Sequence, residues 1–411
     1  MTLSEELSWR GFINQTTLTN LTALDTEKWT FYHGFDASAD SQTVGNLAAM
    51  MLDRCFMRHG HSPIILAGGA TSLIGDPGGK DAERPLQSEE TIAINVAKAE
   101  AQLQQIFRGY DFQLVNNLDW TRELTVISFL RDIGKHFSMT PLIQRDYIAK
   151  RIGEEGDGIS YAEFSYTILQ GMDYLYLYDT YGCTLQLGGS DQWGNCLSGV
   201  DLIRRARGAE THVITLPLII NKATGKKFGK SEDGAVWLDP TKTSVYKFYQ
   251  FWLNADDKGV EGYLKIFTEL DKEAIDSVMK EFKKNKKDRL AQKTLAYAVT
   301  TLVHGEEKAE AAKIASEVLF GGADPGALGA EEYQLLKGEL PIVQAGKGDN
   351  LLQVLVEAGL ASSNTEANRF LDEGAISVNG QKVSGGDRAV LRKGDNLVKR
   401  GKNSFAVVVI K

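Results

Sequence analysis

The stretch Ile64-Ile65-Leu66-Ala67-Gly68-Gly69-Ala70 decides the fold class, because a short apolar run with two β-branched residues ends directly at two glycines. Three more short apolar runs follow the same pattern: Trp29-Thr30-Phe31-Tyr32, Leu185-Gln186-Leu187 and Val213-Ile214-Thr215-Leu216. Amphipathic stretches with helical spacing lie between these runs, for example over residues 88–108. Strands that alternate with helices predict βαβ units and a parallel sheet, in which ligands bind beyond the carboxyl ends of the strands. The sequence therefore predicts an α/β domain whose site lies at the glycines that follow the strands.

The composition is that of an ordinary globular protein and excludes several classes. Of the 411 residues, 43% are hydrophobic and 24% are charged, which argues against a mainly disordered, collagenous or coiled-coil chain. No apolar run approaches the roughly 18 residues of a membrane span, and the N-terminal segment lacks the apolar stretch of a signal peptide. Three cysteines without a Cys-x-x-Cys motif argue against a disulfide framework or a zinc site. We therefore expect a cytoplasmic protein without a membrane partner.

Charge is unevenly distributed along the chain. The net charge of −8 argues against a protein that coats nucleic acid, but residues 351–411 hold nine Lys/Arg and six Asp/Glu. Six basic residues also gather within residues 280–289. Both features are compatible with a local nucleic-acid contact. The alternatives are chance fluctuation for the first feature and a solvated helix face for the second.

The chain changes character after residue 240. Residues 241–320 show helical periodicity with few β-branched runs, which predicts an all-helical unit. Glycine and proline punctuate residues 321–348, a pattern typical of a linker. Residues 349–411 predict a compact α+β unit, in which two short helices precede strands and Asn379-Gly380 forms a hairpin turn.

Two segments suit the binding of phosphate groups, and a third is unusually rich in glycine. Residues 226–231, Lys-Lys-Phe-Gly-Lys-Ser, place three lysines on a flexible loop just after Lys222, which suits a polyphosphate. Residues 68–80 form a glycine-rich loop that matches neither a P-loop nor a dinucleotide fingerprint. Residues 36–46 lead from the first strand into an apolar helix, whose N-terminus can bind an anion. The alternatives are an exposed turn, a structural turn and a plain N-cap, respectively.

Two further segments predict a polar pocket. Tyr166, Gln170 and Asp173 have the spacing i, i+4 and i+7 and so share one face of a helix. Residues 188–195 follow another strand with two glycines, and Asp191 within them is the kind of carboxylate that binds a ribose. A solvated helix face and a capped turn are the alternatives.

The chemistry is expected to depend on positioning and charge stabilisation, as in transfer at phosphorus. The six histidines show no metal-binding spacing, and no metal site of the protein's own is expected. The sequence also lacks a nucleophile elbow, a His-Glu-x-x-His motif and an evident Ser-His-Asp set.

These motifs, in this order, resemble those of bacterial-type tyrosyl-tRNA synthetases, which are class I aminoacyl-tRNA synthetases. The resemblance covers essentially the whole chain and is specific in seven segments: Tyr32–Asp36, Gly68–Lys80, Ser128–Phe137, Glu163–Asp173, Leu187–Asn195, Lys226–Ser231 and Trp237–Pro240. Residues 349–411 look like the small RNA-binding domain that is shared with a ribosomal small-subunit protein.

The resemblance implies a domain order, a reaction and partners. The implied domains are a Rossmann-like parallel-sheet catalytic domain (1–220), a mobile KMSKS-like loop region (221–240), a helical anticodon-side domain (241–320), the linker (321–348) and a C-terminal RNA-binding domain (349–411). The implied enzyme is a tyrosine–tRNA ligase, which forms tyrosyl-adenylate and pyrophosphate from L-tyrosine and ATP and passes the tyrosyl group to tRNA(Tyr). ATP is then a substrate, Mg²⁺ is expected with it, and a homodimer is expected.

The resemblance also implies roles for individual residues. Tyrosine binding is implied for Tyr32, Asp36, Asp76, Asn117, Tyr166, Gln170, Asp173 and Gln192. ATP binding is implied for Gly34, Ser38, Gly45, Asp191, Lys222, Lys227 and Lys230. Catalytic contacts are implied for Thr43, Asn46, Lys80, Arg84, Lys227, Lys230 and Ser231. Within the first group, the substrate phenol would meet Tyr32 and Asp173.

One departure from the family pattern lies in residues 43–46, Thr-Val-Gly-Asn, where a HIGH-type signature is expected. Thr43 stands where relatives carry the first histidine, which donates to an ATP phosphate as the transition state forms. Thr43 keeps a shorter donor, and losing one well-placed donor costs ~10²–10³ in rate. His33 beside Tyr32 is a second candidate donor, with a satisfied strand residue as the alternative.

This departure leaves two other functions open. One is a divergent paralogue that forms an aminoacyl-adenylate for a non-tRNA acceptor. The other is a non-catalytic RNA-binding protein, against which the retained binding residues argue.

Overall fold

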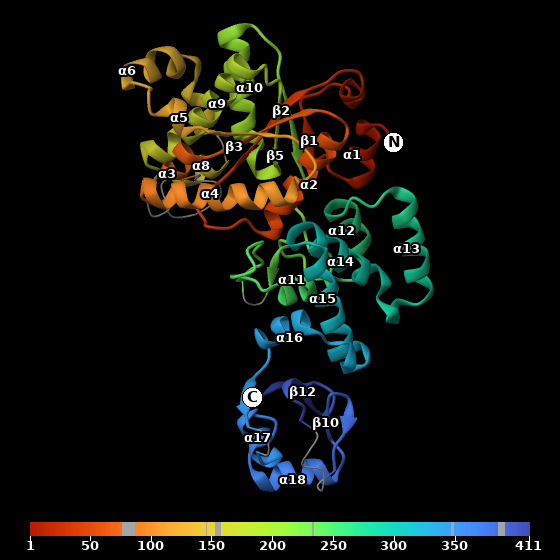
Figure 1. The fold of residues 1–411 in the computed structure, drawn as a ribbon. Coiled ribbons are helices and arrows are strands. Elements are labelled where there is room, and N and C mark those ends of the chain that lie inside the picture. The colour runs from red at the N-terminus through yellow and green to blue at the C-terminus, as the bar shows by residue number, and fades with distance from the viewer. Residues whose placement is uncertain (76–86, 145, 153–157, 232–233, 347–348, 385–390) are drawn as a thin grey trace. The chain divides into compact units, whose positions relative to one another are not determined.

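The computed structural model describes residues 1–75, 87–144, 146–152, 158–231, 234–346, 349–384 and 391–411 (Figure 1). The chain forms two compact units, and each unit is assembled from two segments: Met1–Asp239 with Asp256–Lys284, and Pro240–Ala255 with Asn285–Lys411. The expected helical domain over residues 241–320 is therefore divided, because residues 256–284 pack within the first unit. In the described part of the chain, no helix is both long and apolar enough to cross a membrane.

The first unit is built on a six-stranded sheet with the strand order β1-β6-β5-β2-β3-β4. Its strands are β1 (Gln15–Thr16), β2 (Thr30–Phe35), β3 (Ser62–Ala67), β4 (Gln113–Asn116), β5 (Leu185–Gly189) and β6 (His212–Leu216). All neighbours run parallel except β1, which is antiparallel to β6. The four predicted runs are confirmed as β2, β3, β5 and β6, and with them the α/β class. No apolar run of comparable length marks β1 or β4.

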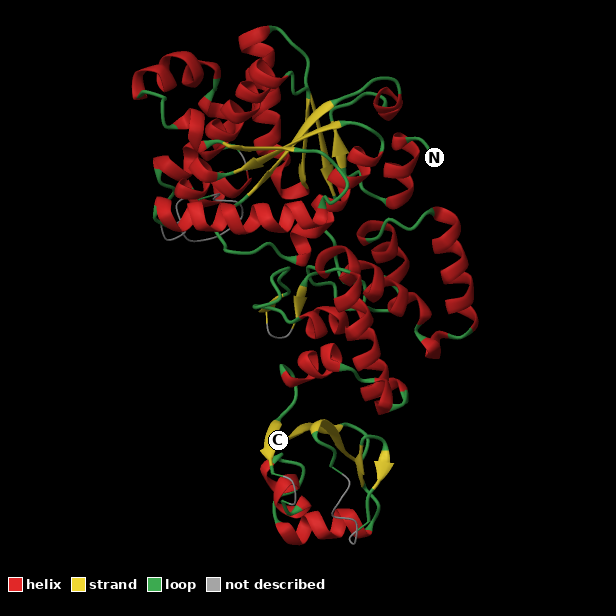
Figure 2. Ribbon diagram, in the orientation of Figure 1, coloured by secondary structure: helices red, strands yellow, loops and turns green. Residues whose placement is uncertain are grey.

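Helices lie on both faces of this sheet (Figure 2). The α-helices of the first unit are α1 (Leu3–Arg10), α2 (Val44–Arg58), α3 (Gly69–Ile74), α4 (Glu89–Ile106), α5 (Leu118–Thr121), α6 (Val126–Ser128), α7 (Met139–Ile143), α8 (Asp146–Ile152), α9 (Tyr161–Tyr181), α10 (Trp193–Arg207), α12 (Val260–Phe267) and α13 (Lys272–Lys284). The predicted helix over residues 88–108 is confirmed as α4, where the Ser88 side chain accepts from the Thr91 amide. A π-helical segment, η2 (Phe129–Ile133), and a 3₁₀ turn, η3 (Gly134–His136), extend the α6 region.

The central strand β2 places consecutive side chains on opposite faces of the sheet, as a pleated strand must. The Phe31 ring contacts Phe56 of α2, with ring centroids 5.1 Å apart. The Tyr32 ring contacts Tyr174 of α9, also at 5.1 Å. The chain continues from β2 to β3 on one side, whereas β5 adjoins β2 on the other, so a topological switch point lies between β2 and β5. In α/β sheets this is where ligands bind.

The second unit begins with helices that share a core with a sheet. The helices are α11 (Val245–Leu253), α14 (Leu290–His304), α15 (Glu306–Ser316) and α16 (Ala330–Lys337). Tyr246 of α11 and Tyr333 of α16 are buried in one cluster with Leu397 and Phe405 of the sheet. The expectation of a linker over residues 321–348 is therefore wrong, because this segment contains α16 and strand β9 (Ile342–Ala345). Its glycines and prolines separate short elements that pack against the core.

The five-stranded sheet of the second unit has the order β11-β10-β12-β13-β9. Its other elements are β10 (Ile376–Val378), β11 (Gln381–Lys382), β12 (Gly394–Arg400), β13 (Ser404–Ile410) and the helices α17 (Leu351–Glu357) and α18 (Asn364–Asp372). The predicted Asn379-Gly380 hairpin is confirmed: both residues have positive φ, 49° and 81°, between the antiparallel strands β10 and β11. Strand β9 pairs in parallel with β13.

The close approach of α9 and α10 gives a stability prediction. A Cβ added at Gly199 of α10 would lie 2.7 Å from Cδ1 of Tyr174, which is itself fully buried. Gly199→Ala should therefore lower the free energy of unfolding by about 1–3 kcal/mol, the usual cost of overpacking. Gly262→Ala in α12 is the matched control, because a Cβ there meets nothing within 4 Å. It should be neutral or stabilise by up to about 1 kcal/mol. Chemical denaturation followed by circular dichroism would measure the free energy of unfolding of both variants. Equal losses of this free energy in the two variants would contradict the packing argument.

Candidate active site

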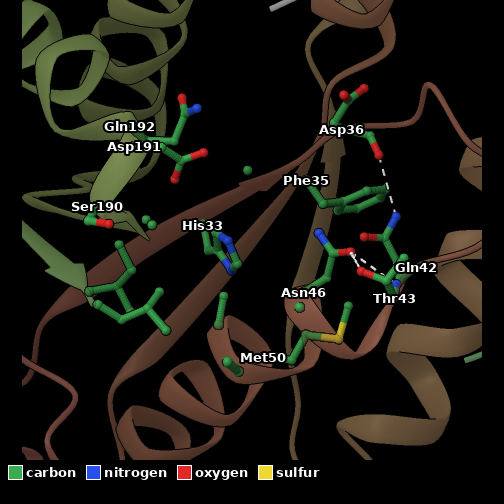
Figure 3. Close-up of a pocket in the computed structure, with 18 of the residues that line it drawn as sticks. His33, Phe35, Asp36, Gln42, Thr43, Asn46, Met50, Ser190, Asp191 and Gln192 are labelled. Atoms are coloured by element: carbon green, nitrogen blue, oxygen red, sulfur yellow. Dashed lines mark hydrogen bonds between the residues drawn. The ribbon is translucent and has the colours of Figure 1, made fainter. Parts of the chain in front are cut away.

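A cavity of about 510 Å³ lies at the carboxyl end of β2 and β5, a volume typical of small-molecule sites. It is lined by residues of β2, by the N-terminus of α2, by α9, and by the segments that follow β5 and β6. The sequence analysis predicted a site at this edge of the sheet, and the structure places the cavity there. Figure 3 shows side chains from β2, α2 and the segment after β5 converging on it.

The helix α9 forms one wall, and its predicted polar stripe lies in the cavity: Tyr166, Gln170 and Asp173 all line it. The helix is fixed at its start by Ser160, whose hydroxyl accepts from the Glu163 amide. The solvated-face alternative for the stripe is therefore wrong. The face is polar because it borders a cavity.

Asp173 is held in place by two donors. Its carboxylate is only 2% exposed and accepts from Nδ2 of Asn117 and from Nε1 of Trp120, each at 2.9 Å. Burial raises the pKa of Asp173 to about 7, although the two hydrogen bonds act in the opposite direction. The site thus contains a buried carboxyl group that is poised between its neutral and charged forms near neutral pH.

Tyr32 contributes an unsatisfied hydroxyl to the same wall. The side chain is 2% exposed, and its hydroxyl has no hydrogen-bond partner among the residues that the structure describes. Burial raises the pKa of Tyr32 well above its usual range, so the group is a neutral O–H. Oε1 of Gln186, which also lines the cavity, is likewise unpartnered within the described residues. Buried polar atoms without partners are rare, so these two mark the place of a polar ligand group.

The opposite wall comes from β2 and the N-terminus of α2. Gly34, Asp36, Thr43, Gly45 and Asn46 line the cavity here. Asn46 accepts from both the backbone N–H and the hydroxyl of Thr43, at 3.0 and 2.7 Å, with its Oδ1 (Figure 3). Because a backbone N–H can only donate, the acceptor must be Oδ1, and Nδ2 of Asn46 is left to donate elsewhere. In this structure the Thr43 hydroxyl donates to Asn46, and its contact with a phosphate stays a prediction.

The segment after β5 forms the third wall. Asp191 and Gln192 line the cavity, as expected, within the short turn Ser190–Gln192 that follows the strand. A Cβ at Gly189 would lie 2.5 Å from Oδ1 of Asp191, so a side chain at position 189 would displace this carboxylate oxygen.

The lysine loop packs against the N-terminus of α2. Lys227 lines the cavity, and Phe228 stacks on Tyr263 of α12 at 4.3 Å. Gly229 has φ +92°, and a Cβ there would lie 3.1 Å from the Gly45 amide nitrogen. The loop and the helix N-terminus are thus in direct contact, and both can face the same anion. Lys222 is exposed and does not line the cavity.

Two predicted ligands lie behind the cavity wall instead of in it. Asn117 is fully buried: its Oδ1 accepts from the Ala70 amide at 2.7 Å, and its Nδ2 donates to Asp173. Ser38 donates to the Asp36 carboxylate from both its N–H and its hydroxyl, at 2.8 and 2.9 Å. Neither is among the residues that line the cavity, so their contacts with the substrates stay predictions.

Some predicted residues fall outside what the structure describes. Asp76, Lys80 and Arg84 lie in the segment 76–86, which is not among the described residues. The backbone of Lys230 and Ser231 forms strand β7 (Lys230–Ser231), which pairs with β8 (Gly234–Ala235), but their side chains are not described.

Two residues of the site, Trp120 and Gln186, were not predicted from the sequence, whereas His33, which the sequence left open as a donor or a satisfied strand residue, lines the cavity and contacts Asp53. Trp120 follows Asn117 by three residues, and this spacing was the available signal that both serve one carboxylate. Gln186 is a polar residue in the middle of an apolar strand run, which is the signal of a strand that borders a site.

Among the described residues, one group of side chains lies close enough together to hold a metal ion: Glu6, Cys55 and His59. Both carboxylate oxygens of Glu6 are already engaged, by Arg10 at 2.6 Å, by Arg58 at 2.5 Å and by His59 at 2.8 Å. Burial alone would raise the pKa of Glu6, but these partners lower it to about 2. The group therefore fits an ion-pair network and not a metal site.

The buried Asp173 gives a pH prediction. Its pKa of about 7 exceeds the ordinary value of 3.8, so between these values the folded protein keeps a proton that the unfolded chain has lost. The contribution of this group to stability is therefore complete below pH 4 and is lost as the pH rises to 7, by at most about 4 kcal/mol. Asp173→Asn cannot ionise, so its free energy of unfolding relative to the wild type should rise between pH 4 and pH 8. Denaturant titrations at both pH values would measure this. A difference between variant and wild type that stays constant between the two pH values would contradict a buried carboxyl group that keeps its proton.

Comparisons with known proteins find matches along nearly the whole chain. Residues 24–321 match the family model described as tRNA synthetases class I (W and Y), and residues 332–408 match the tyrosine–tRNA ligase SYY-like C-terminal domain. The tyrosine–tRNA ligase of Bacillus caldotenax is 46% identical over 392 residues, which cover 93% of this chain and 92% of that protein. The tyrosine–tRNA ligase of Bacteroides fragilis is 41% identical over 439 residues and the full length of both chains.

A solved structure agrees with these relatives. The C-terminally truncated mitochondrial tyrosyl-tRNA synthetase of Aspergillus nidulans superposes with a TM-score of 0.70 at 31% identity, covering 78% of this chain and 94% of that one. These matches confirm the resemblance that the motifs indicated: the chain belongs to the class I (W and Y) family of tRNA synthetases.

Proposed function

We propose that this chain is a tyrosine–tRNA ligase, which activates L-tyrosine with ATP and transfers the tyrosyl group to the 3′ end of tRNA(Tyr). The observation that carries the substrate assignment is the unpartnered hydroxyl of Tyr32 in the wall that contains Asp173. A phenol entering this wall would pair with both groups. The names of the relatives agree with this assignment.

The three walls of the cavity suit the two substrates. The substrate phenol lies between Tyr32 and Asp173, and its ammonium group meets Tyr166 and Gln170, with Asp76 as the expected third partner. Asp36 and Gln192 face the tyrosine carboxylate and the reacting phosphate. Asp191 of the third wall takes the ribose, and Gly34 and Gly45 of the opposite wall allow close approach of the nucleotide.

Activation joins the substrates at the α-phosphorus. A carboxylate oxygen of tyrosine attacks the α-phosphorus of ATP, the bond to the bridging oxygen breaks, and pyrophosphate leaves with the electron pair. Charge then grows on the phosphate oxygens, which the N-terminus of α2, Nδ2 of Asn46 and Lys227 face and stabilise. Lys80, Arg84, Lys222, Lys230 and Ser231 keep their proposed places on the pyrophosphate side.

Transfer follows in the same cavity. A ribose hydroxyl at the 3′ end of tRNA attacks the carbonyl carbon of tyrosyl-adenylate, and AMP leaves. Mg²⁺ is proposed to enter with ATP, held by phosphate oxygens and water as is usual for this ion.

A first test is tyrosine-dependent ATP–pyrophosphate exchange with Tyr32→Phe. The variant removes one hydrogen bond to the substrate phenol, so kcat/KM for tyrosine should fall roughly 2- to 13-fold, equivalent to about 0.5–1.5 kcal/mol. The value for phenylalanine should rise, because a buried hydroxyl is no longer left unpaired when that substrate enters. A variant that loses tyrosine and phenylalanine exchange in equal proportion would contradict the phenol contact.

The wild-type protein distinguishes the alternative functions in the same assay. Exchange with tyrosine followed by charging of tRNA(Tyr) supports the ligase. Exchange without charging of any tRNA would favour a paralogue with another acceptor. Absence of exchange with every amino acid would favour a non-catalytic RNA-binding protein.

The tRNA is proposed to contact basic residues of both units. Lys280 and Lys283 on α13 and the basic residues of 351–411 remain the candidates, together with Lys284, Lys286 and Lys287. Arg289 is removed from this set, because its guanidinium donates to the carbonyl oxygens of Leu253 and Ala255. It serves the fold of the second unit.

A homodimer is proposed on the basis of an exposed apolar surface. Val126 and Ile127 of α6 are 72% and 69% exposed, and Leu130 in the adjoining turn is 50% exposed. Large apolar side chains that gather on a surface mark an interface. The three free cysteines are all buried and unpaired, which agrees with a cytoplasmic location.

Ile127→Asp should convert the dimer to a monomer, because it would place a charge in an apolar contact. Light scattering coupled to gel filtration would give the mass. Ile94→Asp is the matched control, since Ile94 is an exposed apolar residue of α4 at 53% exposure. A wild-type protein that is already monomeric at micromolar concentration would refute the dimer.

A further inference from the structure

The helix α4 is described over its whole length, and none of its residues is among those that line the cavity. It nevertheless contacts a segment that does line it. We propose that Gln102 of α4 is a positioning residue for tyrosine activation, because its side-chain amide fixes the backbone through which the N-terminus of α2 and the lysine loop (residues 226–231) are joined. This inference rests on the proposed function and adds to it a residue that acts from outside the cavity.

One face of α4 holds the segment that links β2 to α2. Asn95, Lys98 and Gln102 have the spacing i, i+3 and i+7, so they share this face. Nδ2 of Asn95 donates to the carbonyl oxygen of Ala37 at 2.8 Å, and Nζ of Lys98 lies 3.1 Å from Oδ2 of Asp40. The three side chains therefore contact successive parts of the linking segment, and Gln102 contacts its last part.

The amide of Gln102 makes two hydrogen bonds there. Its Oε1 accepts from the backbone N–H of Gln42, and its Nε2 donates to the hydroxyl of Ser41, each at 2.9 Å. Because a backbone N–H can only donate, the bond to Gln42 fixes which end of the amide is the oxygen. Ser41 and Gln42 are both buried, so removal of the amide would leave polar atoms of both residues without this partner.

The same two residues bind the part of the chain that follows the lysine loop. The Ser41 hydroxyl accepts from the Asp239 N–H at 3.2 Å and donates to the carbonyl oxygen of Gln42 at 2.9 Å. That carbonyl oxygen also accepts from the Leu238 N–H, at 2.9 Å. We call these bonds the loop–helix contact. It joins residues 198 positions apart, and Gln102 holds it from one side.

The loop–helix contact continues directly into the cavity. Thr43 pairs with Trp237 in an antiparallel bridge, and the Val44 N–H donates to the carbonyl oxygen of Val236 at 2.9 Å. The Val236 N–H in turn donates to the carbonyl oxygen of Gly229, within the lysine loop, at 3.0 Å. Thr43, Val44 and Gly229 all line the cavity. A shift at the loop–helix contact would therefore move the helix N-terminus and the lysine loop relative to each other.

These two elements face the phosphates in the proposed reaction, whereas the tyrosine wall has separate supports. The N-terminus of α2 and Lys227 must act together on the charge that grows at the phosphate oxygens. Asp173, on the tyrosine wall, is held by Asn117 and Trp120 and not by α4. We therefore expect the Gln102 amide to affect the activation step and not the binding of tyrosine.

Two substitutions and a matched control test the amide. Gln102→Met keeps the length of the side chain but removes both hydrogen bonds. Gln102→Glu keeps an oxygen for the Gln42 N–H, and its second oxygen can accept from the Ser41 hydroxyl. The control is Gln104→Met, because Gln104 is exposed on the same helix and donates to Glu100 of that helix.

The measurement is the single-turnover rate of tyrosyl-adenylate formation at saturating ATP and tyrosine. The dissociation constant of tyrosine is measured separately, by equilibrium dialysis without ATP. We expect Gln102→Met to lower the rate about 10- to 100-fold, as for a small misplacement of reacting groups. The tyrosine dissociation constant should change less than about twofold, since no ground-state contact to tyrosine is lost. Gln102→Glu should keep more of the rate than Gln102→Met, and Gln104→Met should match the wild type.

A double-mutant cycle tests whether Gln102 acts through the lysine loop. If Gln102 positions the charge of Lys227, less remains to be lost once Lys227→Ala has removed that charge. The combined loss in rate should then be smaller than the product of the two single losses, by at least about threefold. Thermal melting checks that the variants fold. If Gln102→Met does not fold, Ser41→Ala, which removes the hydroxyl between Gln102 and Asp239, takes its place with the same expectations.

Three results would overturn the inference. They are an unchanged rate in Gln102→Met, a loss of tyrosine affinity as large as the loss of rate, and single losses that simply multiply in the cycle with Lys227→Ala. All three presuppose a wild-type protein that forms tyrosyl-adenylate, so they leave the proposed function standing. A wild-type protein without this activity would overturn the proposed function and this inference together.

Discussion

The pleat of strand β2 is the constraint on which the site depends. Consecutive residues of a strand must point to opposite faces, so Tyr32 and His33 face α9 and α2, respectively. The strand ends in the cavity between these faces. In the proposed function, an amino acid bound on one side and a nucleotide bound on the other would meet at the carboxyl end of this one strand.

Each wall is fixed by groups that do not themselves enter the cavity. Asn117 and Trp120 hold Asp173, Ser38 holds Asp36, and Asp53 holds His33. In each case, a hydrogen bond from a residue outside the cavity lining fixes the direction of a side chain that lines the cavity. Such support costs little when the substrates arrive, because the polar groups are already oriented.

Much of this architecture was predictable from the sequence, for physical reasons that differ between its parts. The strand runs and the stripe of Tyr166, Gln170 and Asp173 are local patterns, and periodicity alone reveals them. The interactions of Asn117 with Asp173 and of Asp53 with His33 join residues 56 and 20 positions apart, and no local pattern encodes them. The hydrogen bond from the Thr43 hydroxyl to Asn46 joins residues only three positions apart, yet the sequence does not predict it either. Only the geometry of the helix N-terminus shows it. Strand β9 was missed because four residues among glycines and prolines carry little periodicity of their own.

The pairing of β9 with β13 has a consequence for how the chain is made. Strand β13 lies between β12 and β9 in the sheet, and its Phe405 and Val407 belong to the cluster that buries Tyr246 and Tyr333. Translation produces β9 about sixty residues before β13. Strand β9 therefore has no strand to pair with until the ribosome has synthesised β13. A nascent chain arrested before residue 404 would expose both an open strand edge and an uncovered aromatic cluster. Those are the features that chaperones and proteases recognise, so incomplete products of this gene would be removed while the first unit is already folded.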